Sequence, residues 1–154
     1  METELVILDE DKTWARQRIA ELDVQIQALG PEFYDVFNQS SETWHDNAPF
    51  DALRDRQSVL DAERQHLKLL LRQSVPSVPP QKPGVAGIGS TVDLSGGQRY
   101  LIAGDWTPWA GQTKDGITII SCQAPLAKVL IGKRVGDTVT IGTRGQKVVA
   151  LVNF

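Results

Sequence analysis

A proline-rich segment, residues 75–84, constrains the fold of this chain more than any other feature. It reads Val-Pro-Ser-Val-Pro-Pro-Gln-Lys-Pro-Gly. Proline lacks a backbone N–H and fixes φ, so four prolines in ten positions exclude a helix and favour a stiff, extended connector. The chain of 154 residues is therefore expected to divide here into two modules.

The residues before the connector have the spacing of a long helix. Apolar side chains recur at intervals of three and four, which is the seam of a coiled coil. The seam consists of Ile19, Leu22, Ile26, Leu29, Phe33 and Val36, and Leu8 and Ala15 extend it backward. It stays in register across Gly30-Pro31, where we expect a kink or a short break without a change of direction.

A second helix is predicted from about Ala48 to Arg72. Its seam is weaker, because it includes two polar side chains: the positions are Phe50, Leu53, Gln57, Leu60, Arg64, Leu67 and Leu71. Only about ten residues separate the two helices, which makes them antiparallel neighbours. Residues 1–74 are thus expected to form a protruding coiled-coil arm.

The residues after the connector are rich in glycine and β-branched side chains, which is typical of strands. Strands are predicted at residues 91–94, 99–102, 117–121, 138–141 and 148–152, with a turn at 95–98. A short helix is expected at 125–130, with proline in its first turn. Residues 85–154 are therefore predicted to form a small α+β domain. Cys122 lies in an apolar run and is expected to be buried; as the single cysteine it cannot form an internal disulfide.

Charge is distributed unevenly along the chain. Residues 1–74 hold 15 acidic and 8 basic side chains, whereas residues 75–154 hold 4 and 8. No Lys or Arg occurs from Ile19 to Leu53, although this stretch contains seven acids: Glu21, Asp23, Glu32, Asp35, Glu42, Asp46 and Asp51. A surface of one sign is expected to meet something positive, such as a divalent metal or a basic channel.

The loop between the helices reads Ser-Ser-Glu-Thr-Trp-His-Asp-Asn-Ala-Pro-Phe-Asp over residues 40–51. Two carboxylates at such a tip can hold Mg²⁺, and a metal held there can activate water for attack on a phosphodiester. Alternatively, Asp46 or Asn47 caps the second helix, whose first turn then contains Pro49. Trp44 and Phe50 could equally close the helix turn.

Other classes of site leave no signal in the sequence. His45 and His66 are 21 residues apart and lack metal-ligand spacing, and no phosphate-binding loop, dinucleotide fingerprint or nucleophile elbow is present. No apolar run is long enough to span a membrane, and the first residues are acidic, unlike a secretory signal. We therefore expect a cytoplasmic protein with no membrane partner.

The C-terminal module resembles a known family. Residues 99–104, Arg-Tyr-Leu-Ile-Ala-Gly, are similar to the family's tyrosine-containing strand. Residues 121–133, Ser-Cys-Gln-Ala-Pro-Leu-Ala-Lys-Val-Leu-Ile-Gly-Lys, resemble its "SPLAxALxGK" signature, and residues 134–139 resemble the "xxGDxV" continuation. On these motifs the chain is identified as a member of the Gre family of bacterial transcript-cleavage and elongation factors.

The resemblance implies an FKBP-like C-terminal domain beneath an antiparallel coiled coil. It implies docking at the secondary channel of bacterial RNA polymerase through the signature residues Pro125, Leu126, Ala127, Ile131 and Gly132. Family members insert the arm so that its acids, here Glu42 and Asp46, share Mg²⁺ at the polymerase active site and promote cleavage of backtracked RNA. The tip would be supported by Thr43, Trp44, Asn47, Phe50 and Asp51. The factor is then an accessory protein without its own cofactor, it meets the nascent RNA 3′ end indirectly, and we expect a monomer.

The tip departs from the family's pattern, which resembles "GDLSENAEY". Asp46 matches the second acid, but the first falls on Thr43, and Glu42 can replace it only if the loop holds one extra residue. The alternative function is therefore a regulator that occupies the channel and modulates or inhibits polymerase without efficient cleavage.

Two further alternatives come from other classes of protein. One is an FKBP-type peptidyl-prolyl isomerase or chaperone, for which the domain has few aromatic side chains: Tyr100, Trp106, Trp109 and Phe154. The other is a plain coiled-coil adaptor, which has no use for an acidic arm end. Trp106 and Trp109 are expected either to pack in the core or to contact polymerase.

Overall fold

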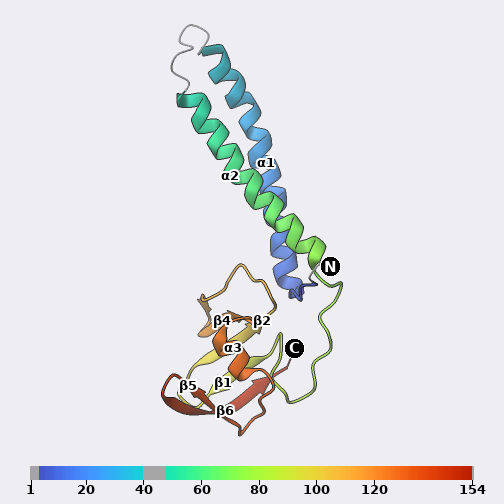
Figure 1. The fold of residues 1–154 in the computed structure, drawn as a ribbon, viewed down its shortest axis with the longest axis vertical. Helices are drawn as coiled ribbons and strands as arrows, with labels where there is room; N and C mark the ends of the chain where they lie inside the picture. The colour runs from blue at the N-terminus through green and yellow to red at the C-terminus, as the bar shows by residue number, and fades with distance from the viewer. Residues whose placement is uncertain (1–3, 40–47, 154) are drawn as a thin grey trace. The chain divides into compact units, whose positions relative to one another are not determined.

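The computed structural model describes residues 4–39 and 48–153, which belong to two compact units (Figure 1). One unit is Thr13–Arg72. The other combines Gln73–Phe154 with the start of the chain, Met1–Lys12. None of the described helices has an apolar stretch of the length needed to cross a membrane.

The first unit is a helical hairpin, the arm. Helix α1 (Asp9–Gln39) and helix α2 (Ala48–Gln73) lie side by side and antiparallel (Figure 1). Helix α1 continues through Pro31, so of the predicted kink or short break the break does not occur. Every predicted seam position in both helices is buried or half-buried, including the polar Gln57 and Arg64. The coiled-coil prediction is therefore confirmed.

The C-terminal unit contains one mixed sheet of six strands in the order β3-β4-β2-β1-β6-β5. The strands are β1 (Thr91–Leu94), β2 (Arg99–Ala103), β3 (Thr113–Lys114), β4 (Ile117–Ser121), β5 (Thr138–Ile141) and β6 (Arg144–Val152). All neighbouring pairs are antiparallel except β2 and β4, which are parallel. The predicted α+β class is confirmed, and helix α3 (Pro125–Leu130) has the predicted bounds.

Two features of the sheet differ from the prediction. The sequence analysis did not predict strand β3. This strand has only two residues, which show no periodicity and owe their conformation to pairing with β4. Strand β6 begins at Arg144 and not at residue 148. Its first residues, Arg-Gly-Gln-Lys, read as a turn in the sequence but pair with β5 along their whole length.

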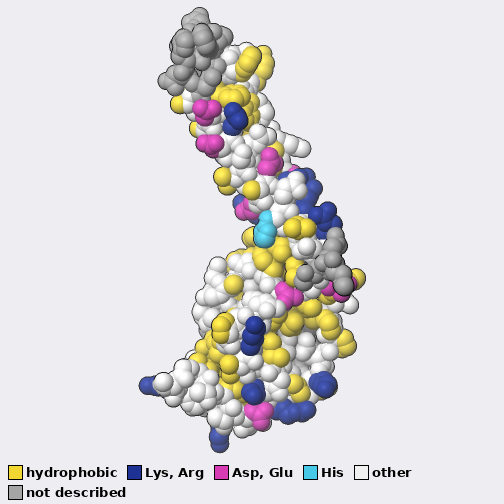
Figure 2. Space-filling model, in the orientation of Figure 1, with side chains coloured by type: hydrophobic (Ala, Val, Ile, Leu, Met, Phe, Trp, Pro, Cys, Tyr) yellow, Lys and Arg dark blue, Asp and Glu magenta, His cyan; other side chains and the backbone are white. Residues whose placement is uncertain are grey.

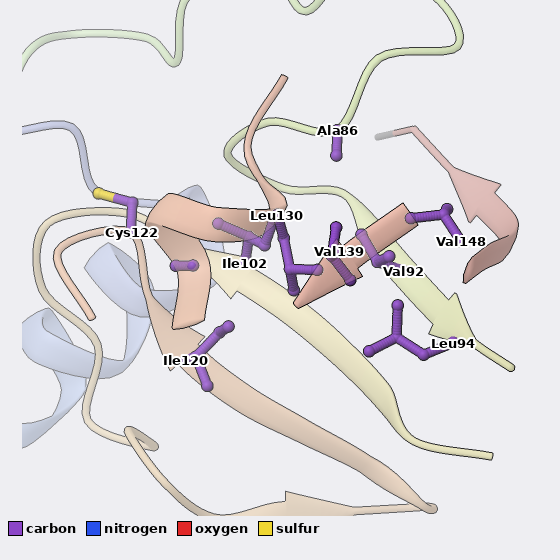
Figure 3. Close-up of a cluster of buried hydrophobic side chains, with 10 residues drawn as sticks. Ala86, Val92, Leu94, Ile102, Ile120, Cys122, Leu130, Val139 and Val148 are labelled. Carbon is purple, nitrogen blue, oxygen red and sulfur yellow. The ribbon is translucent and has the colours of Figure 1, made fainter. Parts of the chain in front are cut away.

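The core of this unit lies between α3 and one face of the sheet (Figure 3). Val92, Ile102, Leu130 and Val139 are buried there. Cys122 is 8% exposed, which confirms its predicted burial, and that burial raises the pKa of its thiol to about 11, with the nearby Asp105 adding to the effect. The thiol is therefore protonated at neutral pH.

The first described residues belong to this C-terminal unit, although the sequence analysis assigned residues 1–74 to the arm. The N–H of Leu5 donates to the carbonyl of Gln73, and the N–H of Val75 donates to the carbonyl of Leu5, both at 2.8 Å. Ile7 is 1% exposed. Sequence periodicity could not reveal this extension of the sheet domain, because its partners lie about 70 to 100 residues away.

Val6 and Asp105 hold this segment in place. The Val6 N–H donates to Oδ2 of Asp105 at 2.7 Å, and the Asp105 N–H donates to the Val6 carbonyl at 2.6 Å. The side-chain amide of Gln123 donates to Oδ1 of the same carboxylate at 2.7 Å. Burial raises the pKa of Asp105, but the hydrogen bonds from Val6, Gln123 and Cys122 outweigh it and hold the pKa below the usual range.

Gly104 permits this contact by lacking a Cβ, which would meet the Val6 carbonyl oxygen at 2.0 Å. We predict that Gly104→Ala lowers the free energy of unfolding by about 2 kcal/mol or more, because backbone must shift. Urea denaturation measures the loss, and hydrogen exchange at the Val6 amide should become faster. Gly145→Ala is the matched control, since its Cβ would make an ordinary 3.7 Å contact with Thr138. Equal stability of the two variants would contradict the docking contact.

Asp11, in the first turn of α1, is 5% exposed, and its Oδ2 has no hydrogen-bond partner among the described residues. Burial raises the pKa of Asp11 to about 6, against an interaction with the Thr107 hydroxyl that lowers it; the charge of Glu10 adds to the increase. Between pH 4 and 6 the folded state therefore binds a proton that the unfolded state releases.

The pKa of Asp11 has a consequence for stability. Wild-type protein should lose stability as pH rises from 4 to about 7, by up to about 3 kcal/mol from this group. Asp11→Asn should lack this loss of stability, so the difference in free energy of unfolding between the variant and wild type should grow in favour of the variant as pH rises. Urea denaturation between pH 4.5 and 8 tests the difference, with Asp115→Asn as an exposed control. Parallel pH profiles for wild type and Asp11→Asn would contradict the prediction.

Candidate functional site

The predicted tip lies largely outside the described residues. Glu42, Thr43, Trp44, Asp46 and Asn47 fall in the interval 40–47, so the proposed metal-directed acids stay a prediction. Of the predicted tip residues, the structure places Phe50 and Asp51.

Phe50 joins the two helices next to the tip. It stands in the first turn of α2, and its ring packs against Phe33 of α1 with centroids 5.6 Å apart and planes at 74°. Edge-to-face rings in this range attract one another beyond simple burial. Asp51 follows in the same helical turn with an exposed side chain, where the helix dipole favours a carboxylate. Phe50 thus closes the end of the seam and leaves Asp51 accessible.

The arm is less uniformly acidic than the sequence indicated. Arg64 of α2 forms an ion pair with Asp23 of α1, and Arg56 of α2 forms one with Glu32 at 3.7 Å. Glu21 pairs with Arg18 at 3.2 Å. The expectation of an unneutralised acidic surface is wrong for these three acids. Arg18 precedes Glu21 on the same helix, and the antiparallel helix α2 brings Arg64 and Arg56 alongside Asp23 and Glu32.

Four acids of the described arm, Asp35, Asp51, Asp55 and Asp61, form no ion pair with any residue that the structure describes. Asp35 lies near the end of α1, and Asp51 lies at the start of α2. Both are exposed and belong to the helix ends that border residues 40–47. Two of the four unpaired acids of the described arm therefore lie beside the predicted tip.

Sequence analysis missed two exposed aromatic side chains close to the tip. Tyr34 and Phe37 of α1 are each 68% exposed. Their spacing of three places them on one side of the helix. A signal was available, because Phe33 and Val36 occupy the seam and the residues that follow each of them must then point away from α2. Large exposed aromatics in this position suit contact with a partner.

The predicted docking residues surround α3 in the C-terminal unit. Pro125 is exposed in the first turn, Leu126 packs partly against the core, and Ile131 is 38% exposed just after the helix. Gly132 ends the helical turn with φ of +88°, a left-handed conformation that favours glycine. Ala127 is fully buried, so it supports α3 from below and cannot be a contact residue.

Apolar and basic side chains extend this region beyond the predicted residues. Val129 and Val135 are 37% and 57% exposed, and Lys128 and Arg134 are exposed beside them in the chain. We call Pro125, Val129, Ile131 and Val135, with Lys128 and Arg134, the α3 surface. Basic side chains outnumber acidic ones on the visible face of the C-terminal unit (Figure 2). The chemistry of the α3 surface suits an apolar partner surface with acidic surroundings.

Within residues 4–39 and 48–153, no three His, Cys, Asp or Glu side chains are grouped so that they could hold an ion. The predicted pair Glu42 and Asp46 lies outside these ranges.

The family assignment is supported by comparison with known proteins. Residues 81–153 match the family described as "Transcription elongation factor, GreA/GreB, C-term". A GreA elongation factor of Geobacillus kaustophilus is 30% identical over 115 residues, which cover 70% of this chain and 68% of that protein. A GreA of Rickettsia bellii is 33% identical over 106 residues, covering 65% of this chain and 63% of that protein.

Among solved structures, Gfh1 of Thermus aquaticus resembles this chain with 20% identity and a TM-score of 0.42, over 97% of both chains. The match to the Geobacillus protein covers more than two thirds of both chains. Together with the C-terminal match, it shows that this chain belongs to the GreA/GreB family of transcription elongation factors.

Proposed function

We propose that this protein binds bacterial RNA polymerase and stimulates cleavage of backtracked nascent RNA from the polymerase's secondary channel. The observation that carries the proposal is a slender arm in a chain of the GreA/GreB family. Helix α1 has 31 residues, roughly 45 Å at 1.5 Å per residue. Two helices of this length that share a single seam bury little surface for their size. We therefore infer that the arm serves to extend into a partner and not to form a compact domain.

The tip supplies the chemical part of this proposal. Glu42 and Asp46 would offer carboxylate oxygens to Mg²⁺ in the polymerase active site, where the metal lowers the pKa of bound water for attack on RNA. Asp51, exposed at the start of α2, adds negative charge beside them. The protein itself is then an accessory factor and the catalytic centre is that of polymerase. Cytoplasmic location and a monomeric state complete the proposal.

The C-terminal unit supplies the anchor. We assign docking to the α3 surface, whose exposed valines and isoleucine lie next to Lys128 and Arg134. Near the other end of the arm, Tyr34 and Phe37 present apolar area that a channel wall can bury. The two contacts would hold the arm at its base and near its tip.

A second candidate function is supported by the tip sequence. The first acid of the family pattern falls on Thr43, and three acids of α1 are already paired with arginines. With fewer available carboxylates, the arm could fill the channel and slow polymerase without supporting cleavage.

RNA cleavage in halted, backtracked elongation complexes with Mg²⁺ separates the two functions. We predict short 3′ fragments with wild-type protein and a loss of at least about tenfold in their rate with Glu42→Ala or Asp46→Ala, since each removes a carboxylate from the metal. Asp55→Ala, which changes an exposed acid of α2 outside the predicted tip, should cleave like wild type. Slowed elongation with no fragments from any form would establish the non-cleaving regulator instead.

The exposed aromatics give an independent prediction. Tyr34→Ser combined with Phe37→Ser should weaken binding to core polymerase by about tenfold, because about 1.4 kcal/mol of apolar contact is lost. The free energy of unfolding should change by less than about 0.5 kcal/mol, since both side chains are exposed. Equilibrium binding and urea denaturation measure the two quantities. Val24→Ser, at a 67% exposed position farther from the tip, is the control. Unchanged binding of the double variant would remove Tyr34 and Phe37 from the interface.

A further inference from the structure

The sheet of the C-terminal unit has a second apolar face, opposite the core. Strand registers align Ile119 with Leu101, Leu101 with Thr91, and Thr91 with Val152, so these four residues form one row across four strands. Their neighbours Ile102, Ile120 and Val92 point into the core. Because side chains alternate along a strand, the row lies on the other face.

A groove runs along this row. A cavity of about 200 Å³ is lined by Leu101, Ile119, Trp109 and Asp11, and an adjoining one of about 370 Å³ by Thr91, Leu101 and Val152. Leu8, Glu10 and Leu101 line both cavities, so the two lie next to each other. Each cavity has room for a few side chains, and the groove suits a short peptide segment better than a folded surface.

One wall of the groove is acidic. Asp9, Glu10 and Asp11 follow one another in the first turn of α1 and line the cavities, against one lining cation, Lys114. The ammonium of Lys114 lies 4.5 Å from the centre of the Trp109 ring, a cation–π contact. We call the row Ile119, Leu101, Thr91 and Val152, with the wall of Leu8 and these three acids, the acidic groove.

The helix dipole explains acids in a first helical turn, but it does not explain why Asp11 is buried. This side chain is 5% exposed, and its Oδ2 accepts no hydrogen bond from any described residue. A buried carboxylate oxygen without a donor destabilises the folded protein. Because Asp11 lines a cavity, a donor group that enters from outside has room to reach this oxygen.

We propose that the acidic groove is a second docking surface for RNA polymerase, and that it receives a short segment bearing an apolar side chain next to a lysine or arginine. The inference rests on the proposed function and adds the partner chemistry of a surface distinct from the α3 surface. The aliphatic stem of a lysine or arginine packs on Leu101 and Ile119, while its charged end reaches Glu10 and Asp11. The apolar neighbour covers Val152, which is 64% exposed.

Because the two surfaces carry opposite charges, they favour different segments of the partner. The α3 surface carries Lys128 and Arg134 and selects acidic surroundings, whereas the acidic groove selects basic ones. Both surfaces can therefore be occupied together by different parts of one polymerase, with the like-charge pairing disfavoured at each.

The test is the affinity of full-length protein for purified core RNA polymerase, measured by label-free equilibrium binding at 50 and 300 mM salt. Glu10→Lys and Val152→Lys place a positive charge in the groove at accessible positions. Each has a matched control: Glu4→Lys makes the same charge change outside the groove, and Val149→Lys changes a 53% exposed valine of the same strand that lines neither cavity. A photo-crosslinking residue at position 152 identifies the polymerase segment.

We expect both groove variants to bind at least about tenfold more weakly at 50 mM salt, with a smaller difference at 300 mM because salt screens the repulsion. The controls should stay within about twofold of wild type. The crosslinked peptide should contain lysine or arginine beside an apolar residue. If wild type binds polymerase and the groove variants bind equally well, or the crosslinked peptide lacks basic residues, this inference is overturned while the proposed function stands. If wild type does not bind, the proposed function fails as well.

Discussion

The structure depends on one backbone contact, between Val6 and the residues Gly104 and Asp105. Two hydrogen bonds, one from the Val6 N–H to the Asp105 carboxylate and one from the Asp105 N–H to the Val6 carbonyl, attach the start of the chain to a strand end nearly 100 residues away. The attached segment also pairs with the residues that leave α2, through Leu5 and Val75. The segments that lead into and out of the arm are therefore held together within one unit.

This attachment also shapes the face of the sheet that lies opposite the core. Leu8 and the acids of the first helical turn form a wall over the face of strands β2 and β4 that lies opposite α3. The domain then has two chemically different sides: an apolar and basic one around α3, and an apolar and acidic one under the N-terminal segment. A small domain with two such faces is suited to holding one large partner at more than one point.

Much of this architecture could be predicted, because its signals are local. The interval of three and four between Ile19 and Val36 defines the seam of α1, and Ala124-Pro125 and Gly132 delimit α3. The misses have a common cause. Strand β3, the first half of β6, the ion pairs of Asp23 and Glu32, and the docking of Val6 all depend on residues distant in the chain. The burial of Ala127 follows from which side of a short helix meets the sheet.

The sequence by itself determined the class of each module and the family, since apolar periodicity and the signature around Pro125 are properties of neighbouring residues. Only the tertiary structure decided which charges remain available. Antiparallel packing pairs Asp23 and Glu32 of α1 with arginines of α2, while the docked N-terminal segment buries Oδ2 of Asp11 without a donor among the described residues. Electrostatic energy depends on distance through space, and a linear sequence does not contain those distances.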